Sequence, residues 1–321
     1  MSETWNVAVV GATGAVGEAM VEILEQRKFP VGELYLLASE RSAGKRVSFR
    51  GKQVAVKNLA DFDFSQVHIG LFSAGGSISA EFAPKAAEAG CVVIDNTSHF
   101  RRDPDIPLVV PEVNPHAAAN WRNRGIIANP NCSTIQMLVA LKPLHDAVGL
   151  ERINVATYQA VSGTGKSAIE ELAGQTARLL NTFQDNGYTR EEMKMVWETQ
   201  KIFEDDSIQV NPTCVRIPVF HGHAEAVHIE TREALSAEGA RELLATAPGV
   251  TVIDEREDGG YATQVTDAAG TDPVFVSRIR EDISHPRGLN LWVVSDNLRK
   301  GAALNSIQIA ELLVSEGLLD R

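Results

Sequence analysis

The chain has 321 residues, of which 44% are hydrophobic and 22% are charged, and its net charge is −12. This length allows about two ordinary domains, and the composition is that of a folded globular protein rather than a disordered one. The negative charge argues against nucleic acid and anionic membranes as partners. The three cysteines are widely spaced and form no Cys-x-x-Cys pair, so we expect neither a disulfide framework nor a bound metal.

The N-terminus carries no recognisable targeting segment. Residues 1–5 lead directly into an apolar run without the pattern of a signal peptide. No apolar run approaches the roughly 18 residues of a membrane span. We therefore expect a cytoplasmic protein.

A strand, a glycine-rich turn and a helix are predicted next. Residues 5–10 form a continuous apolar run, which is typical of a strand covered on both faces. In the following segment Gly11–Gly17, Gly11 permits a tight turn and Gly14 lets a pyrophosphate approach backbone N–H groups. Gly17 lets the helix pack closely on the strand. The context predicts a dinucleotide-binding loop, although the spacing is GxxGxxG rather than GxGxxG, and a plain strand–helix turn is the alternative.

The end of the second predicted strand, residues 33–38, indicates which dinucleotide binds. In such folds this strand end contacts the adenosine ribose. Ser39, Arg41 and Ser42 supply donors suited to a 2′-phosphate. We therefore predict NADP, while Glu40 keeps NAD possible because an acidic residue there can receive a 2′-hydroxyl.

Two more buried strands are predicted before residue 100. Residues 69–76 form one that ends in a glycine turn where cofactor could lie, and residues 91–95 form the other, with Cys91 in the core. The loop at residues 96–102 leaves the sheet where strand ends present functional side chains. Its two adjacent arginines, Arg101 and Arg102, suit an anionic substrate, and a solvated loop is the alternative.

A cysteine opens the next predicted helix. Cys132 follows a turn at Asn129–Asn131 and precedes residues 135–144, whose apolar positions have helical spacing. Unpaired backbone N–H groups and the dipole at a helix N-terminus favour a thiolate. The position predicts a reactive Cys132, and a cysteine that packs as a small hydrophobic residue is the alternative.

After Cys132 the pattern of elements changes. Helices are predicted over residues 168–180 and 188–202, the second with Thr189 as N-cap and Glu192 as its capping-box partner, and a final helix over residues 300–316. Strands are predicted at residues 152–161, 215–219, 226–231, 274–283 and 289–296. Strands that cluster in this way indicate an α+β second domain, in contrast to the α/β first half.

Five motifs distributed over nearly the whole chain are specific enough to indicate a family. They are Gly11–Gly17, Pro107–Asn114, Asn129–Gln136, Tyr158–Gly163 and Asp296–Ala303. Together they resemble aspartate-semialdehyde dehydrogenases. The resemblance implies a Rossmann-like NADP-binding domain, assigned to residues 1–131 and 297–321, and an α+β catalytic and dimerisation domain, assigned to residues 132–296.

The resemblance also implies an activity and a set of ligands. The activity is reversible, phosphate-dependent, NADP-linked interconversion of L-aspartate 4-semialdehyde and L-4-aspartyl phosphate, on the route to lysine, threonine, methionine and diaminopimelate. A homodimer is implied as well. The cofactor is expected to contact Gly11, Thr13, Gly14, Ala15, Val16, Gly17, Ser39, Arg41, Ser42, Ser73, Ser162, Gly163 and Asn297.

Catalytic roles transfer from the family to matching positions. Cys132 resembles the nucleophile that forms a thioester, and Gln159 the residue that orients the intermediate. His223, which follows Gly222, matches the acid–base histidine, although His221 is an unusual neighbour. A histidine pKa near 6.5 would let the ring take the thiol proton and exchange a proton with the tetrahedral oxygen.

Substrate-binding roles transfer in the same way. Arg216 resembles the arginine that binds the substrate carboxylate, and Glu191 an acidic residue that helps to hold the substrate. Arg101 and Lys194 match a phosphate-binding pair, and Asn131 a residue near the phosphate.

One departure from the family separates the alternatives. Here only Thr182–Gln184 joins two predicted helices. Family members usually carry roughly twenty further residues in this connection. This loss could expose apolar surface, alter dimer contacts and misplace Glu191 and Lys194. A shortened, inactive family paralogue that binds nucleotide or a partner is therefore one alternative. Another acyl-phosphate reductase, such as N-acetylglutamyl-phosphate reductase, is the second, and Gln159 and the spacing from Arg216 to His223 argue against it.

Overall fold

The computed structural model describes residues 4–164 and 182–319. Their contacts divide the chain into two compact units. Met1–Pro130 and Ala302–Arg321 form the first unit, and Asn131–Gly301 forms the second. The helix predicted over residues 168–180 lies outside the described residues.

The first unit is built on a seven-stranded sheet in the order β3-β4-β2-β1-β5-β6-β7. Its strands are β1 (Trp5–Val10), β2 (Val31–Ala38), β3 (Arg46–Phe49), β4 (Lys52–Asn58), β5 (Ile69–Phe72), β6 (Val92–Asp95) and β7 (Ile126–Ala128). All neighbours pair in parallel except β3 and β4, which form an antiparallel hairpin at one edge. The parallel strands and their helices α1 (Ala15–Gln26) and α2 (Gly76–Glu88) confirm the predicted α/β, Rossmann-like class.

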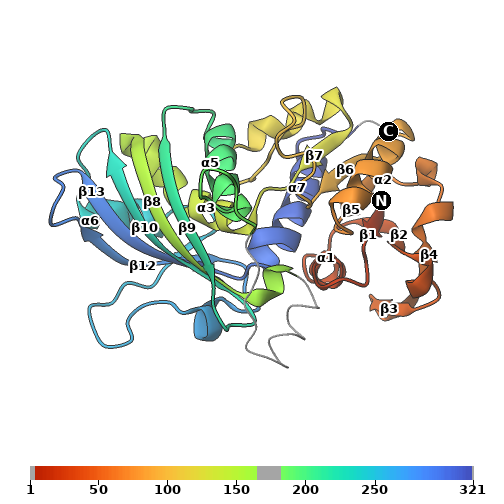
Figure 1. Cartoon of the computed structure of the whole chain (residues 1–321). Coiled ribbons are helices and arrows are strands. Elements are labelled where there is room, and N and C mark those ends of the chain that lie inside the picture. Colours follow the sequence, from red (N-terminus) through yellow and green to blue (C-terminus); the bar gives the residue numbers. More distant parts are fainter. Residues whose placement is uncertain (1–3, 165–181, 320–321) are drawn as a thin grey trace. The chain divides into compact units, whose positions relative to one another are not determined.

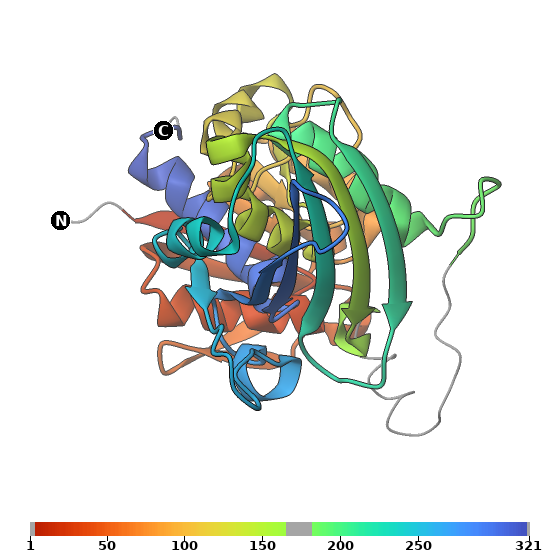
Figure 2. The ribbon, with the colours of Figure 1, turned by 90° about the vertical axis from the view of Figure 1, so that its left-hand side faces the viewer.

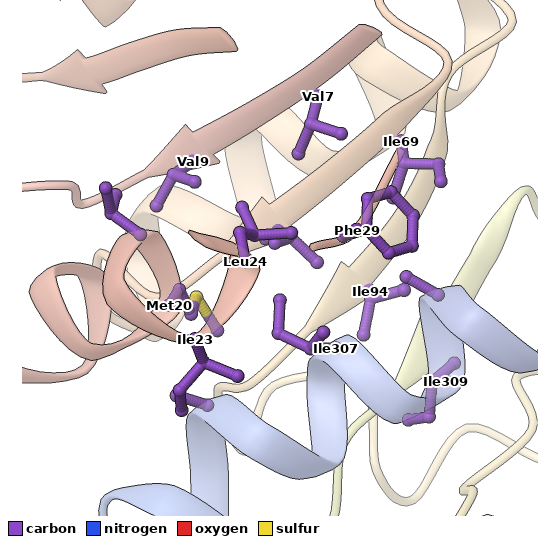
Figure 3. Close-up of a cluster of buried hydrophobic side chains, with 14 of the residues drawn as sticks. Val7, Val9, Met20, Ile23, Leu24, Phe29, Ile69, Ile94, Ile307 and Ile309 are labelled. Carbon is purple, nitrogen blue, oxygen red and sulfur yellow. The ribbon is translucent and has the colours of Figure 1, made fainter. Parts of the chain in front are cut away.

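The last helix of the chain, α7 (Leu304–Ser315), packs against α1 in the core of the first unit. Figure 3 shows Val7 of β1, Leu24 of α1 and Ile307 of α7 around one hydrophobic cluster, and all three side chains are fully buried. A π-helical turn, η7 (Arg299–Ala303), precedes α7, so the regular helix begins later than its predicted start at Lys300.

The second unit is built on a six-stranded mixed sheet in the order β11-β12-β13-β10-β8-β9. Its strands are β8 (Leu150–Gln159), β9 (Gln209–Arg216), β10 (His223–Thr231), β11 (Val250–Val252), β12 (Val274–Glu281) and β13 (Gly288–Ser295). Helices α3 (Cys132–Val148) and α5 (Arg190–Phe203) cover one face of this sheet, as Figure 1 and Figure 2 show, and α6 (Ala237–Ala245) packs on α3, β11 and β12. This arrangement confirms the predicted α+β class of the second domain.

The strand expected to begin at Ala226 begins three residues earlier, and this difference affects the site. His223 pairs with Ser295 of β13, and Ala224 pairs with Tyr158 of β8. His223 therefore belongs to the central strand β10 rather than to the predicted loop. A strand side chain with neighbours on both sides has a fixed direction, whereas a loop side chain does not.

Helix α5 has the predicted start. The Thr189 side chain accepts a hydrogen bond from the Glu192 backbone N–H, and the Glu192 side chain accepts one from the Thr189 N–H, so the capping box is complete. Before this helix, Phe183 of the short connection is 71% exposed. The connection leaves Glu191 and Lys194 on the first turns of α5.

Candidate functional site

Cys132 is the first residue of α3, and the side chain of the preceding residue caps this helix. Asn131 is the N-cap, and its side-chain oxygen accepts hydrogen bonds from the backbone N–H groups of Ser133 and Thr134. On the other side, a Cβ atom at Gly301 would lie 2.7 Å from the Cβ of Cys132. Glycine is therefore required there for the chain to pass this close to the cysteine.

His223 faces the cysteine sulfur. The Cys132 Sγ lies 3.2 Å from the His223 Nε2, although the two residues are 91 positions apart in the chain. The backbone N–H of Ala160 donates to the His223 Nδ1 at 3.0 Å. Because Nδ1 accepts this bond, the neutral ring carries its proton on Nε2, the atom that faces the sulfur. His221, the other candidate, is exposed.

The basicity of His223 differs from the expected value near 6.5. The side chain is fully buried. Burial disfavours the charged ring, and the nearby Arg216 guanidinium adds to this effect, so the pKa of His223 is lowered to about 3. At neutral pH the ring is uncharged, and it meets the sulfur as a hydrogen-bond donor rather than as an imidazolium.

This burial predicts a pH dependence of stability. The unfolded chain takes up a proton on His223 below pH 6.5, but the folded chain does so only near pH 3. The contribution of His223 to stability is therefore complete above pH 6.5 and is lost progressively as the pH falls toward 3. When the pH falls from about 7.5 to about 5, the free energy of unfolding of the wild type should decrease by about 2 kcal/mol more than that of a His223→Asn variant. Urea denaturation of both proteins at both pH values measures this difference, and equal losses would contradict it.

Side chains of helix α5 hydrogen-bond Asn131, the N-cap of α3. The Glu191 carboxylate accepts hydrogen bonds from the Asn131 side-chain amide at 2.7 Å and from the Lys194 ammonium at 2.9 Å. Two turns further along α5, Glu198 accepts a hydrogen bond from the Asn131 backbone N–H. Burial opposes ionisation of Glu191, but Lys194, the Asn131 amide and Arg216 lower its pKa to about 2. Sequence reasoning missed Glu198, whose only signal is its i+7 spacing from Glu191.

The ends of β8 and β9 bring two further predicted residues to this site. Gln159 and Arg216 are register partners on these parallel strands. The Gln159 side-chain amide donates to the Ser133 hydroxyl oxygen at 2.9 Å, and the Arg216 guanidinium donates to the Ala160 carbonyl oxygen at 2.8 Å. The second unit thus gathers Cys132, His223, Gln159, Asn131, Glu191, Lys194 and Arg216. Arg101 lies in the first unit, where it donates to the Asn96 carbonyl oxygen at 3.0 Å.

A cavity of about 560 Å³ lies at the carboxyl ends of β1, β2 and β5 in the first unit. A Cβ atom at Gly17 would lie 2.2 Å from the Gly11 carbonyl oxygen, so the first turn of α1 packs directly on the glycine turn that follows β1. Gly14, the N-cap of α1, has no side chain, so the N–H groups of the first turn can receive an anion. The lining includes Gly11, Thr13, Gly14, Ser39, Arg41, Ser42 and Ser73, whereas Ala15, Val16 and Gly17 form the helix turn behind it.

The adenosine end of this cavity suits a 2′-phosphate. Arg41 is exposed at the end of β2 beside Ser39 and Ser42. The Thr13 hydroxyl lies 3.5 Å from the Ser42 hydroxyl, which joins the glycine turn to this segment. Glu40 also lines the cavity. An arginine and two hydroxyl groups fit a phosphate, so the residues present fit NADP.

The remaining predicted cofactor residues lie beside His223 in the second unit. The Ser162 hydroxyl and the Asn297 side-chain amide hydrogen-bond each other at 3.0 Å, and the Asn297 oxygen also accepts from the Gly222 N–H. A Cβ atom at Gly163 would lie 3.4 Å from the His223 ring and 3.3 Å from the Arg216 guanidinium. This segment therefore lies against the His223 ring and the Arg216 guanidinium.

Comparisons with known proteins identify relatives of this chain. A family model described as semialdehyde dehydrogenase, NAD binding domain, matches residues 6–121. One described as semialdehyde dehydrogenase, dimerisation domain, matches residues 141–183 and 179–300. Aspartate-semialdehyde dehydrogenase 2 of Vibrio cholerae serotype O1 is 63% identical over 98% of this chain and 99% of its own length. The chain belongs to the aspartate-semialdehyde dehydrogenase family.

Other relatives of the family extend the comparison. Aspartate-semialdehyde dehydrogenase of Bacillus subtilis is 49% identical over 98% of both chains. A crystal structure of aspartate semialdehyde dehydrogenase II from Vibrio cholerae complexed with ASA matches with a TM-score of 0.95 and 62% identity, and covers 98% of this chain and 99% of that chain. The Candida albicans enzyme, solved with NADP, matches with a TM-score of 0.78 and 25% identity over 99% of this chain and 100% of that chain.

The short connection is visible in these comparisons. The alignment with the Vibrio cholerae relative extends over 338 positions, more than the 321 residues of this chain, so the relative has residues that this family member lacks. The dimerisation-domain match is divided in two at residues 179–183. The two matched parts meet at the Thr182–Gln184 connection, where, from the sequence, a segment is expected to be missing.

Proposed function

We propose that the chain catalyses reversible, NADP- and phosphate-dependent interconversion of L-aspartate 4-semialdehyde and L-4-aspartyl phosphate. The observation that supports this most directly is the Cys132–His223 pair, with the sulfur 3.2 Å from a ring nitrogen at the N-terminus of α3. Gln159 and Arg216 flank the pair on neighbouring strands. A nucleophilic sulfur beside a hydrogen-bond donor and an arginine suits an aldehyde that also bears a carboxylate.

In the oxidative direction, the Cys132 thiolate attacks the aldehyde carbon and the carbonyl oxygen becomes an oxyanion. The Nε2–H of His223, opposite the sulfur, is placed to donate to this oxygen. Bound NADP would accept hydride at its nicotinamide. As the oxyanion re-forms the carbonyl, the former aldehyde hydrogen leaves the carbon as that hydride, and the carbon stays bonded to the Cys132 sulfur as a thioester. Phosphate oxygen then attacks the thioester carbon, the carbon–sulfur bond breaks, and the sulfur leaves as the thiolate.

Charged side chains are assigned to the acidic groups of the substrates. Arg216 presents a planar guanidinium that pairs well with the substrate carboxylate. Glu191 fixes both Asn131 and Lys194, so substitution of this carboxylate disturbs the N-cap of the nucleophile's helix as well as the lysine. Arg101 and Lys194 are assigned to phosphate, whose charge both can neutralise.

The second unit is assigned to homodimer formation because the dimerisation-domain model matches it. The working form is therefore proposed to be a homodimer that binds the semialdehyde, the acyl phosphate and inorganic phosphate. Within residues 4–164 and 182–319, no helix combines the length and apolar character needed to cross a bilayer. The cytoplasmic location stays a prediction.

The test is absorbance at the reduced-nicotinamide band with purified protein, L-aspartate semialdehyde, NADP and phosphate. We expect reduction of NADP that requires both the aldehyde and phosphate. N-acetylglutamate semialdehyde serves as the matched substrate control and should give no signal. A folded, dimeric protein that binds NADP without turnover would overturn the proposal in favour of a shortened, inactive family member.

The cofactor assignment makes a separate prediction. We expect Arg41→Ala to raise the KM for NADP by about 10- to 100-fold, because a charge-assisted bond to the 2′-phosphate is lost, and to leave the KM for NAD nearly unchanged. Arg46→Ala, at an exposed arginine on the neighbouring strand β3, is the matched control. Equal effects on both cofactors would refute a phosphate contact by Arg41.

A further inference from the structure

A carboxylic acid is buried directly behind the nucleophile's helix. Glu225 follows His223 by two positions on β10, so both side chains point to the same face of the sheet, the face on which α3 packs. Both side chains have no exposed surface. A carboxyl group in this position is costly unless neighbouring polar groups satisfy it, and none of the steps described above uses it.

The strand register shows which residues surround this acid. Glu225 pairs with Thr157 on β8 and with Val293 on β13. Thr157 precedes Gln159 by two positions, so it shares the face of that glutamine. Directly paired residues on antiparallel strands bring their Cβ atoms within about 5 Å, which places the Thr157 side chain beside that of Glu225.

Several polar atoms around Glu225 have unused hydrogen-bonding capacity. Within the part of the chain that the structure describes, neither Glu225 oxygen has a partner at normal geometry, and neither does Gln136 Nε2 or Thr157 Oγ1. The Gln136 and Ser133 side chains nevertheless lie close enough to influence the ionisation of the acid. Burial raises the pKa of Glu225 well above its usual range, and these two side chains offset the rise only in part. Burial therefore favours the uncharged carboxylic acid over the carboxylate.

Ser133 connects this acid to the predicted catalytic glutamine. The Ser133 oxygen accepts from the Gln159 amide at 2.9 Å, so its own hydroxyl proton is available to another acceptor. On the opposite side, Gln136 receives a hydrogen bond from the Ser295 hydroxyl at 2.7 Å, which directs its amide nitrogen away from β13. The Glu225 oxygens thus lie where they can accept hydrogen bonds from the Ser133 hydroxyl and from the Gln136 amide nitrogen.

We propose that Glu225 is a positioning residue for the reaction at Cys132, and that it accepts the Ser133 hydroxyl and thereby fixes the side-chain amide of Gln159. The proposal rests on the dehydrogenase function proposed above. An uncharged acid accepts from Ser133 through its carbonyl oxygen and donates its own proton to the Thr157 hydroxyl. Without it, the Ser133 hydroxyl can rotate, and Gln159 loses a fixed partner.

The decisive variants differ in shape and in hydrogen bonding. Glu225→Gln replaces a neutral acid by a neutral amide of the same shape, and we expect its kcat to stay within about three-fold of the wild type. Glu225→Leu removes the acceptor, and we expect kcat to fall by about ten-fold or more, with a smaller change in the KM for the semialdehyde. Glu230→Leu, the same substitution near the other end of β10, is the matched control and should leave kcat unchanged.

The route through Ser133 is tested by a double-mutant cycle. We expect Ser133→Ala to lower kcat as much as Glu225→Leu does, and the double variant to be no worse than either, because both break one chain of bonds. Additive losses, or Ser133→Ala with wild-type kcat, would overturn the proposal, and the second outcome does so even if Glu225→Leu does not fold. A Glu225→Gln variant as impaired as Glu225→Leu would show that the residue acts through its charge instead. Wild-type protein without turnover would refute the proposed function itself, an outcome distinct from all of these.

Discussion

Replacing Cys132 with serine is expected to reduce kcat/KM for the semialdehyde by about 10³-fold or more. A serine hydroxyl is almost wholly protonated at neutral pH, and a neutral His223 that donates from Nε2 cannot take its proton. A cysteine thiol is more acidic than a serine hydroxyl, and the N-terminus of α3 favours its thiolate form. The loss should therefore be in the acylation step and not in NADP binding.

Two measurements distinguish a lost nucleophile from a damaged fold. NADP affinity, followed by quenching of protein fluorescence, should be unchanged in Cys132→Ser. Mass spectrometry of wild-type protein mixed with semialdehyde and NADP in the absence of phosphate should show an aspartyl group on the peptide that contains Cys132. Cys91→Ala, at a buried cysteine in the first unit, is the matched control and should retain activity. Serine-variant turnover within ten-fold of the wild type would mean that the sulfur is not the nucleophile.

Replacing His223 with asparagine is expected to lower kcat by about 10²- to 10⁴-fold. The asparagine amide can retain the bond from the Ala160 N–H, but it cannot reach the position of Nε2 opposite the sulfur. Glutamine is long enough to place an N–H donor near that position. We therefore expect His223→Gln to keep more activity than His223→Asn, because the ring acts as a hydrogen-bond donor to the oxyanion.

The neighbouring histidine supplies the control for this pair of variants. His221→Asn changes an exposed ring two residues away and should leave kcat within about two-fold of the wild type, as surface substitutions usually do. The pH profiles add a second criterion, since no ionisation of a neutral His223 should appear between pH 5 and 8. A kinetic pKa near 6.5 that disappears in His223→Gln would instead support proton transfer by an imidazole of ordinary basicity.

Features that depend on neighbours in the chain were predictable from the sequence. The apolar run at residues 5–10 followed by Gly11 and Gly17 specifies a strand and a close turn, because only glycine fits where the first turn of α1 packs on the backbone of Gly11. The capping box at Thr189 and the cysteine at the start of α3 follow equally from local hydrogen bonding. The change from alternating elements to clustered strands also predicted both fold classes.

The chemistry of the site was decided by the tertiary structure, because it depends on strand register. Side chains alternate between the faces of a sheet, so a slip of one residue in the pairing of β10 with β13 would turn His223 away from Cys132. The same register buries Glu225 behind the helix. Burial in turn sets protonation, since it removes the water that would stabilise charge on His223 and Glu225. Local sequence identifies which residue types are available, but neither their faces nor the water they lose on folding is local information.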